Sequence, residues 1–280
     1  MGALMWLASY PKSGNTWMRS FLHNLLRGSD EPVAINDLDH FCLGESDSKW
    51  YTRHFEGVLK EAGEEEVARI RPEGQRDMTR AFPDTVFVKT HNFLGEKHET
   101  ALHNMDVTAG AIYIVRNPLD VALSMTHHFG TDIDAAIDRL GQEGAITDMS
   151  DTHIMEYHAS WSTHVSSWTA RENRGLLVMR YEDMLAKPRR EFRRVSDFLG
   201  LKPSRDRLDR AIRNSSFKTL QSQERRKDFK ERSEYSKAFF RVGKEGQWKG
   251  ILDSDQVARV VERHGEQMAR FGYLPGKKKK

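Results

Sequence analysis

The sequence predicts a single α/β domain in which helices flank a central parallel β-sheet. Short, nearly continuous apolar runs are the first observation behind this prediction, because strands buried on both faces of a parallel sheet have this character. The second observation is that stretches with helical periodicity separate the runs, as crossover helices do between parallel strands. The third is that the 280 residues contain no repeat and no linker rich in Pro, Gly and Ser, which favours one domain.

Four segments have the apolar character of buried strands. They are residues 4–8, 86–88, 111–115 and 176–179. The first of them, Leu-Met-Trp-Leu-Ala, ends at a polar turn that contains glycine, and such a turn commonly ends a strand. We expect all four to lie side by side in the sheet.

Four segments have the apolar spacing of helices. Residues 17–26 show it first, and Gly28 then ends the pattern, as glycine often does after a helix. Residues 118–129 begin with proline, which is well tolerated in the first turn. Residues 192–199 and 253–271 complete the set. Patterns are weak over residues 29–80, 130–152 and 222–245, and we expect the densely charged residues 222–232 to form a solvated loop.

The net charge of +3 comes from the end of the chain. Residues 277–280 are four lysines, and without them the 44 basic side chains become 40 against 41 acidic ones. Bulk charge therefore gives no support for broad nucleic-acid binding. We predict a domain over residues 1–276 that is followed by a disordered lysine tail.

Cysteine content and hydropathy favour a cytoplasmic protein without a membrane segment. Cys42 is the only cysteine, so no disulfide can form within the chain. The apolar run at residues 3–8 has no basic residues before it and is far shorter than the roughly 20 residues that cross a bilayer.

The segment YPKSGNTW, residues 10–17, is the strongest local signal of a ligand site. It lies between a predicted strand and a predicted helix, where free backbone N–H groups and the helix dipole favour an anion such as phosphate. Gly14 permits a close approach of the backbone, Thr16 adds a hydroxyl donor and Lys12 a full charge. An ordinary capped helix start is the alternative. The Walker pattern is absent, which disfavours a standard ATP or GTP site but not a related fold.

Three further segments place polar groups at the ends of predicted strands. Arg116 follows one strand, and Ser124 lies two turns into the next helix, at the edge where α/β sheets bind ligands. A structural salt bridge is an equal alternative for Arg116. Lys89 and His91 follow another strand, and a histidine there can take a proton from a substrate hydroxyl. Residues 239–249, with Arg and Gly after two aromatic residues, suit a loop that closes over an anion.

The histidines do not form a metal motif. His98, Glu99 and His103 miss the H-E-x-x-H zinc pattern by one residue, so the two histidines fall on different helix faces. His127 and His128 are adjacent and diverge on a helix. We expect no metal, and His128 or Phe129 is a candidate border of an acceptor pocket.

The four segments, in this order, resemble those of cytosolic-type sulfotransferases. That family transfers a sulfuryl group from 3′-phosphoadenosine-5′-phosphosulfate (PAPS) to a hydroxyl or amine and leaves 3′-phosphoadenosine-5′-phosphate (PAP). The resemblance extends from about residue 4 to residue 273 and includes the motifs YEDM at 181–184 and SSFK at 215–218. It implies a nucleotide-binding topology similar to that of P-loop NTPases.

The resemblance also implies a role for each matching residue. It places five residues on the 5′-phosphosulfate: Lys12, Ser13, Gly14, Asn15 and Thr16. It places five residues at the 3′-phosphate: Arg116, Ser124, Arg241, Val242 and Gly243. Val242 would contribute only its backbone. Around the adenine it implies Trp17, Tyr181, Ser215 and Phe217. Its catalytic residues are His91 as general base, with Lys12, Lys89 and Ser124.

The implied reaction is in-line displacement at sulfur on a small-molecule acceptor, with neither metal nor nucleic acid. Two alternatives remain: a P-loop-like nucleotide kinase, and a non-catalytic nucleotide- or polyanion-binding module that uses Arg241, residues 189–194 and the lysine tail. The oligomeric state and the acceptor stay open. The aromatic candidates for the acceptor pocket are Phe41, Trp50, Phe55, Phe93, Phe129 and Tyr157.

Overall fold

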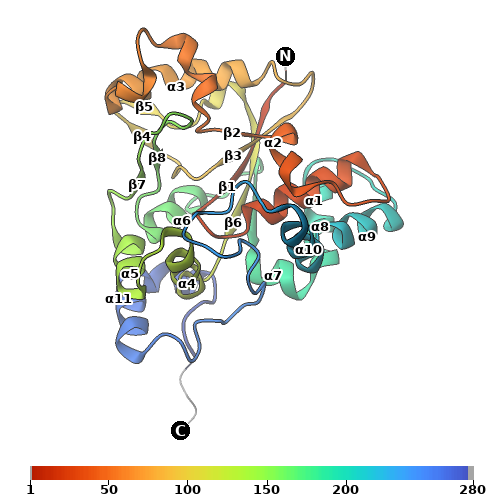
Figure 1. The fold of residues 1–280 in the computed structure, drawn as a ribbon, viewed down its shortest axis with the longest axis vertical. Helices are drawn as coiled ribbons and strands as arrows, with labels where there is room; N and C mark the ends of the chain where they lie inside the picture. Colours follow the sequence, from red (N-terminus) through yellow and green to blue (C-terminus); the bar gives the residue numbers. More distant parts are fainter. Residues whose placement is uncertain (1, 277–280) are drawn as a thin grey trace.

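A computed structural model describes residues 2–276 of the chain, so the predicted lysine tail at 277–280 lies outside the described residues. Five parallel strands form the central sheet, in the order β2–β3–β1–β6–β9 (Figure 1). Their bounds are β1 Leu4–Ser9, β2 Cys42–Gly44, β3 Val86–Thr90, β6 Thr108–Val115 and β9 Leu176–Arg180. The predicted parallel sheet is confirmed, and its four predicted strands are β1, β3, β6 and β9.

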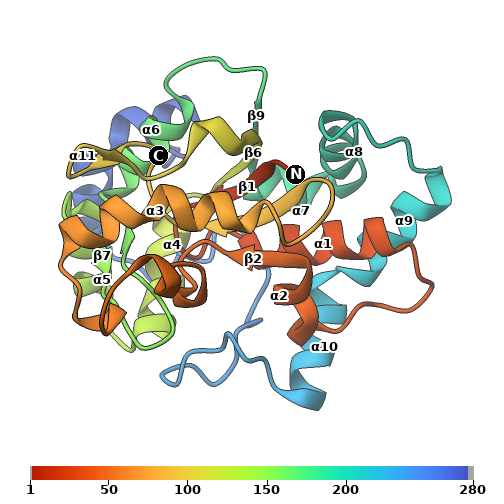
Figure 2. The same ribbon diagram turned by 90° about the horizontal axis from the view of Figure 1, so that it is seen from above.

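Helices cover both faces of this sheet. On one side lie α1 (Asn15–Arg27), α7 (Tyr181–Ala186), α8 (Pro188–Phe198) and α9 (Arg205–Asn214). On the other side lie α3 (Glu64–Met78), α4 (Pro118–Phe129), α5 (Ile133–Gly141), α6 (Trp161–Thr169) and α11 (Ser254–Arg270). Figure 2 shows the two layers from above, with α1, α8 and α9 grouped apart from α4, α5, α6 and α11. Shorter elements are α2 (Leu38–Phe41) and the two-stranded ribbons β4–β5 (Glu96–Lys97, Thr100–Ala101) and β7–β8 (Ile146–Thr147, Glu156–Tyr157).

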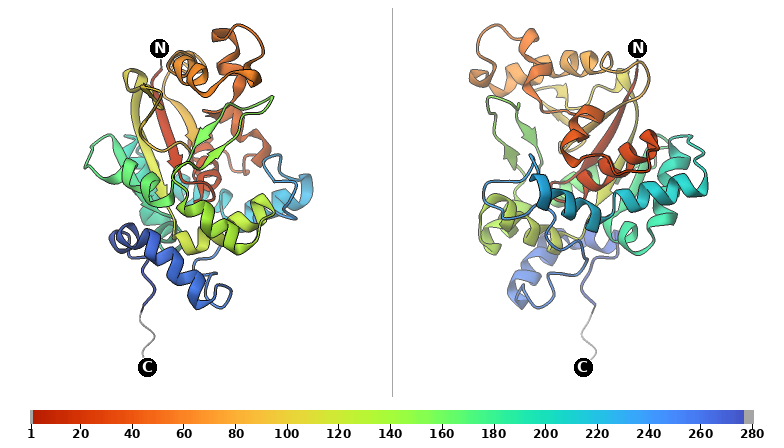
Figure 3. Two further views of the ribbon diagram at one scale, coloured as in Figure 1. Left: turned by 90° about the vertical axis from the view of Figure 1, so that its left-hand side faces the viewer. Right: turned by 45° about the vertical axis from the view of Figure 1, so that its right-hand side comes forward.

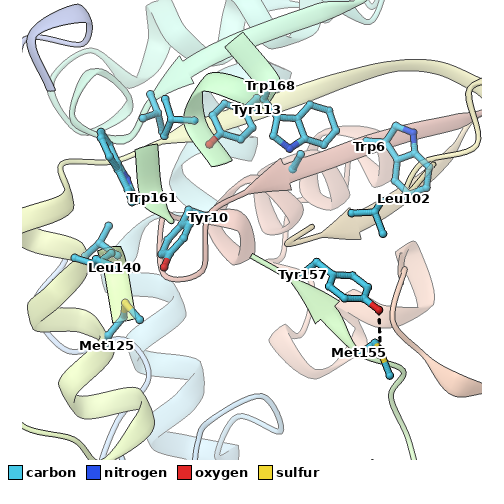
Figure 4. Packing of buried hydrophobic residues seen from close by; sticks show 14 of the residues in the cluster. Trp6, Tyr10, Leu102, Tyr113, Met125, Leu140, Met155, Tyr157, Trp161 and Trp168 are labelled. Atoms are coloured by element: carbon cyan, nitrogen blue, oxygen red, sulfur yellow. Dashed lines mark hydrogen bonds between the residues drawn. The ribbon is translucent and has the colours of Figure 1, made fainter. Parts of the chain in front are cut away.

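The alternation of side chains along β1 explains why both faces are apolar. Leu4, Trp6 and Ala8 are fully buried in the larger core cluster, whereas Met5 and Leu7 belong to the cluster beneath α1 and α8. Figure 4 shows Trp6 in the larger cluster together with aromatic side chains of β6 and α6. A strand buried on both faces reads as one continuous apolar run, which is the pattern that predicted it.

The charged segment after Phe217 is a helix, so the loop predicted for residues 222–232 is wrong over its first half. Helix α10 spans Phe217–Lys227, and the Ser216 hydroxyl caps it by accepting a hydrogen bond from the Thr219 N–H. Leu220 and Glu224 are its buried residues. One buried apolar side chain among many charged ones leaves too weak a periodicity to recognise from sequence. Residues 228–253, called the crossing segment below, then lead from α10 to α11 past the carboxyl ends of the strands (Figure 3).

A fully buried carboxylate ties α3 to the ends of β2 and β3. Glu45 accepts hydrogen bonds from the Tyr51 hydroxyl at 3.0 Å, from Gln75 Nε2 at 3.0 Å and from Asn92 Nδ2 at 2.7 Å. Arg71, which is also fully buried, forms a salt bridge with the same carboxylate. Because Asn92 follows His91 directly, this network fixes the backbone beside the predicted catalytic histidine.

We expect Arg71→Met to lower the free energy of unfolding by about 3–5 kcal/mol, because it leaves the Glu45 carboxylate buried without its charge partner. Urea unfolding followed by circular dichroism measures this change. Arg76→Met, on a partly exposed position of the same helix, is the control and is expected to change stability by about 0.5 kcal/mol or less. A loss below about 1 kcal/mol for Arg71→Met would show that the ion pair is not needed.

Candidate active site

A cavity of about 520 Å³ opens at the carboxyl ends of β1, β3 and β6. Strand β1 lies between β3 and β6, and the chain turns to opposite sides of β1 to form them. Such a switch point is the place where open α/β sheets bind ligands. All predicted site residues except Ser13 and Ser215 line this cavity: Lys12, Gly14, Asn15, Thr16, Trp17, Lys89, His91, Arg116, Ser124, Tyr181, Phe217, Arg241, Val242 and Gly243.

The loop between β1 and α1 presents its backbone to the cavity. Gly14 stands at the N-cap of α1 with φ of 106°, a conformation that favours glycine, and no side chain caps this helix. A Cβ atom on Gly14 would lie 2.8 Å from the Tyr181 ring. The first N–H groups of α1 therefore have no side-chain partner. An anion site needs such free N–H groups, whereas a side chain occupies them at an ordinary capped helix start.

The polar side chains of this loop have different roles: some hold the loop in place, and others are free to bind a ligand. Asn15 Nδ2 donates a hydrogen bond of 2.8 Å to the Leu7 carbonyl, which ties the loop to β1. Thr16 Oγ1 accepts a hydrogen bond from Arg19 at 3.1 Å, so its own proton remains available to a ligand. Ser13 is fully buried and its hydroxyl has no hydrogen-bond partner among the described residues.

Arg116 binds the loop rather than a carboxylate. Its Nη1 donates a hydrogen bond of 2.9 Å to the Lys12 carbonyl, and its guanidinium carbon lies 4.5 Å from the centroid of the Tyr181 ring. Among residues 2–276, Arg116 forms no salt bridge. Arg116 therefore does not take part in the structural salt bridge that was the alternative. The charge of its guanidinium faces the cavity.

Two buried carboxylates hold the segment that carries Arg241. Asp120 on α4 accepts hydrogen bonds from the N–H groups of Gly246 (2.7 Å) and Trp248 (3.1 Å). Glu224 on α10 accepts hydrogen bonds from the N–H groups of Phe239 and Phe240, at 2.6 and 2.9 Å. These anchors on both sides bring Arg241 to the same cavity as Ser124 of α4.

The predicted adenine-binding residues lie partly at the cavity. Trp17 and Tyr181 meet edge to face, with ring centroids 5.8 Å apart. Phe217 packs so closely that a Cβ on Gly243 (φ 62°) would lie 2.3 Å from its ring. Ser215 is fully buried, and its hydroxyl donates to the Ala211 carbonyl at 2.8 Å. Its predicted contact with adenine therefore finds no support in the position of its side chain.

His91 is oriented as a proton acceptor. Its Nδ1 lies 2.7 Å from the Ser9 carbonyl oxygen, which can only accept, so Nδ1 carries the proton and Nε2 keeps its lone pair. Burial, followed by the nearby charge of Lys89, lowers the pKa of His91 to about 3. The imidazole is therefore neutral at physiological pH.

Positive charge accumulates around Lys12. Burial, together with the charges of Arg116, Lys89 and Arg241, lowers its pKa to about 7. The Lys12 ammonium also lies 4.3 Å from the centroid of the Phe239 ring. Like charges repel in this arrangement until an anion binds among them.

Several cavity residues were not predicted from the sequence. Glu156 and His158 come from the β7–β8 ribbon and the turn after it, in a stretch with little periodicity. Glu231 lies in the crossing segment and pairs with Arg19 through two hydrogen bonds of 2.6 and 2.9 Å. No sequence pattern brings these segments to the cavity, because only the long-range packing does so.

Most of the aromatic candidates for the acceptor pocket lie elsewhere. Phe129 lines the cavity, as does its neighbour His128. The other five do not line it: Phe41, Trp50, Phe55, Phe93 and Tyr157. Phe41, for instance, stacks on His23 on the far side of α1, with ring centroids 4.8 Å apart.

The arginines of α8 do not form a free cationic face. Arg189 binds Asp209 through two hydrogen bonds of 2.7 Å, while Arg190 and Arg194 both pair with Glu191. Arg193 forms no salt bridge among the described residues, and its Nη1 donates a hydrogen bond of 3.2 Å to the Pro203 carbonyl. The carboxylates of Asp209 and Glu191 therefore reduce the positive charge of this face without cancelling it, which weakens one support of the binding-module alternative. The described part of the chain holds neither a cluster of three metal-ligating side chains nor a helix long and apolar enough to cross a membrane.

Comparisons with known proteins agree with the motifs. The family model of the sulfotransferase domain matches residues 4–272. The dog protein Sulfotransferase 1B1 is 27% identical over 217 residues, which span 76% of this chain and 64% of that protein. Mouse Sulfotransferase 2A2 is 25% identical over 276 residues, or 96% of this chain and 85% of that protein. The crystal structure of mouse sulfotransferase SULT7A1 complexed with PAP has the same fold, with a TM-score of 0.63 at 21% identity, over 95% of this chain and 84% of that one. With nearly its whole length matched by the family model, the chain belongs to the sulfotransferase family.

Proposed function

We propose that this chain transfers a sulfuryl group from PAPS to a hydroxyl group of a small-molecule acceptor, with His91 as general base. One observation carries the proposal: Lys12, Lys89, Arg116 and Arg241 converge on one cavity, and within residues 2–276 none of them forms a salt bridge. Basic side chains that lack salt-bridge partners in a partly closed cavity favour a ligand with several negative charges.

The two anion sites suit the two ends of PAPS. The N-terminus of α1 and Lys12 would hold the 5′-phosphosulfate, and Arg116, Ser124 and Arg241 would hold the 3′-phosphate. ATP carries all of its phosphates on the 5′ side and would leave the second site without an anion. The PAP complex of mouse sulfotransferase SULT7A1, which shares this fold, supports the same choice of nucleotide.

The chemistry then follows from the positions of His91 and Lys12. The acceptor oxygen attacks sulfur while its proton moves to Nε2 of His91. The bond between sulfur and the bridging oxygen breaks, and its electron pair remains on the phosphate of PAP. Lys12 and the free N–H groups of α1 stabilise this charge, and fixed donors of this kind often supply the largest catalytic contribution. An anionic donor beside Lys89 also offsets the charge that lowers the pKa of His91.

Binding of PAP is expected to take up a proton above neutral pH. Lys12, with a pKa near 7 in the free protein, is largely neutral at pH 8, and bound phosphate favours its charged form. The dissociation constant should therefore rise as the pH increases from 7 to 9, by up to about tenfold per unit for one linked proton. Calorimetry at pH 8 in buffers of different ionisation enthalpy measures the uptake. Lys12→Met should abolish it, and uptake that persists in this variant would assign the proton to another group.

A transfer assay with radiolabelled PAPS and a panel of phenols, alcohols and sugars tests the proposal directly. Label should appear in at least one acceptor and depend on both the donor and the protein. Mg²⁺-dependent turnover of ATP without any sulfuryl transfer would instead support the nucleotide-kinase alternative.

A further inference from the structure

One acidic side chain of the cavity has only a distant partner. Glu156 lies on β8 and lines the same cavity as His91, with its side chain only 12% exposed. Among the described residues no N–H or O–H group lies within hydrogen-bond distance of its carboxylate, and the one partner within 4 Å is the His158 imidazole, with Nε2 at 3.9 Å. Two other charged side chains of the cavity are closely paired, Glu231 with Arg19 and Lys230 with Asp39.

The fold holds Glu156 in a fixed relation to His91. Asn92, the residue after His91, accepts a hydrogen bond of 2.7 Å from the N–H group of Tyr157, the residue after Glu156. The Tyr157 carbonyl in turn accepts a hydrogen bond of 2.9 Å from the Phe93 N–H. On its other side Glu156 is paired with Thr147 of β7. An acceptor that places its hydroxyl at His91 therefore meets Glu156 at a defined position.

The carboxylate is ionised in this setting. Burial by itself raises its pKa, but the neighbouring His158 side chain and the charge of Lys89 outweigh burial and hold the pKa of Glu156 well below its usual range. A buried carboxylate can only accept hydrogen bonds, and leaving it unpaired is costly. In the donor complex proposed above, the sulfonate neutralises Lys89, so the pocket then offers Glu156 no strong cation.

We propose that Glu156 binds a protonated amine of the acceptor, so that the preferred acceptors are alcohols or phenols that carry an amine at a short distance from the reacting hydroxyl. This inference rests on the proposed function of the site. A charge-assisted hydrogen bond satisfies the carboxylate better than a neutral hydroxyl does. An acceptor with a carboxylate in the same place is repelled.

Four matched phenols test this specificity. They carry an ammonium, a hydroxyl, a methyl or a carboxylate group at the end of the same two-carbon chain. For each, we would measure kcat/KM with PAPS, and the dissociation constant from the complex of the full chain with PAP. The ammonium compound should exceed the methyl compound about 10- to 100-fold. Glu156→Gln, which keeps the shape and removes the charge, should reduce that ratio to near one. Glu172→Gln, at an exposed position outside the cavity, should leave it unchanged.

The possible outcomes distinguish failure of this inference from failure of the proposed function. Turnover in which the ammonium and methyl compounds are equal, or a ratio that survives in Glu156→Gln, would overturn the role of Glu156 while leaving sulfuryl transfer intact. If the hydroxyl compound is preferred over the ammonium compound, Glu156 does not select a cation, and the inference fails as well. Absence of PAP binding in the wild-type chain would reject the proposed function itself, and the inference with it.

Discussion

His91→Asn should lower kcat/KM for sulfuryl transfer about 10²- to 10⁴-fold, the usual contribution of a positioned general base. Asparagine retains an N–H group that can donate to the Ser9 carbonyl, as Nδ1 of His91 does. Asparagine has no counterpart of Nε2, so no side-chain nitrogen is left to accept the proton of the acceptor hydroxyl. The neutral imidazole carries no charge toward the donor, and PAP affinity should change by less than about threefold.

Steady-state rates with labelled PAPS, together with calorimetric titration of PAP, measure both quantities in the His91 variant. His40→Asn, whose side chain is 78% exposed, is the matched control and should keep full activity. Full activity in His91→Asn would remove this residue from the role of base. Loss of PAP binding along with activity would show a structural defect instead.

Lys12→Met should reduce kcat by about 10²- to 10³-fold, the typical effect of removing one group that stabilises developing charge. Methionine keeps an apolar chain that can pack near Phe239, which the Lys12 ammonium now contacts. The charge on the leaving phosphate is then stabilised only by the N–H groups of α1. Because removal of Lys12 also relieves repulsion among the remaining cations, PAP affinity should fall less than kcat does.

Single-turnover rates at saturating PAPS separate the chemical step from donor binding in this variant. Lys202→Met, an exposed lysine away from the cavity, serves as the control and should behave like wild type. Equal losses in kcat and in PAP affinity would mean that Lys12 binds the ground state and contributes nothing specific to the transition state.

The sheet was predictable because its strands are local features of the sequence. β1 and β6 are continuous apolar runs, and α4 begins at Pro118 and ends before Gly130, as its sequence predicts. Helix α3 was not predicted, since buried polar residues such as Arg71 and Gln75, which contact Glu45, interrupt the apolar pattern of its buried face. Such contacts join segments about 30 residues apart, and they produce no periodic pattern in the sequence.

The donor end of the site was far more predictable than the acceptor end. Loops that bind phosphate need glycine and cations at fixed offsets, so the segment at residues 10–17 and the one around Arg241 can be recognised in sequence. The acceptor end is built from the β7–β8 ribbon and the crossing segment, whose side chains are defined only by tertiary packing. Glu156 was recognised only from its burial at the cavity and from the 3.9 Å that separates it from its one partner, His158, and a sequence records neither.

The central claim is that the cavity holds a nucleotide with anions at both its 3′ and 5′ positions. Thermal unfolding of the full chain with equal concentrations of PAP, adenosine 5′-phosphate and ATP tests it most directly, because a ligand stabilises the folded state according to its concentration relative to its dissociation constant. PAP should raise Tm well above the other two, and Arg241→Met should bring PAP close to adenosine 5′-phosphate. Stabilisation by ATP or adenosine 5′-phosphate that equals that by PAP would contradict the account.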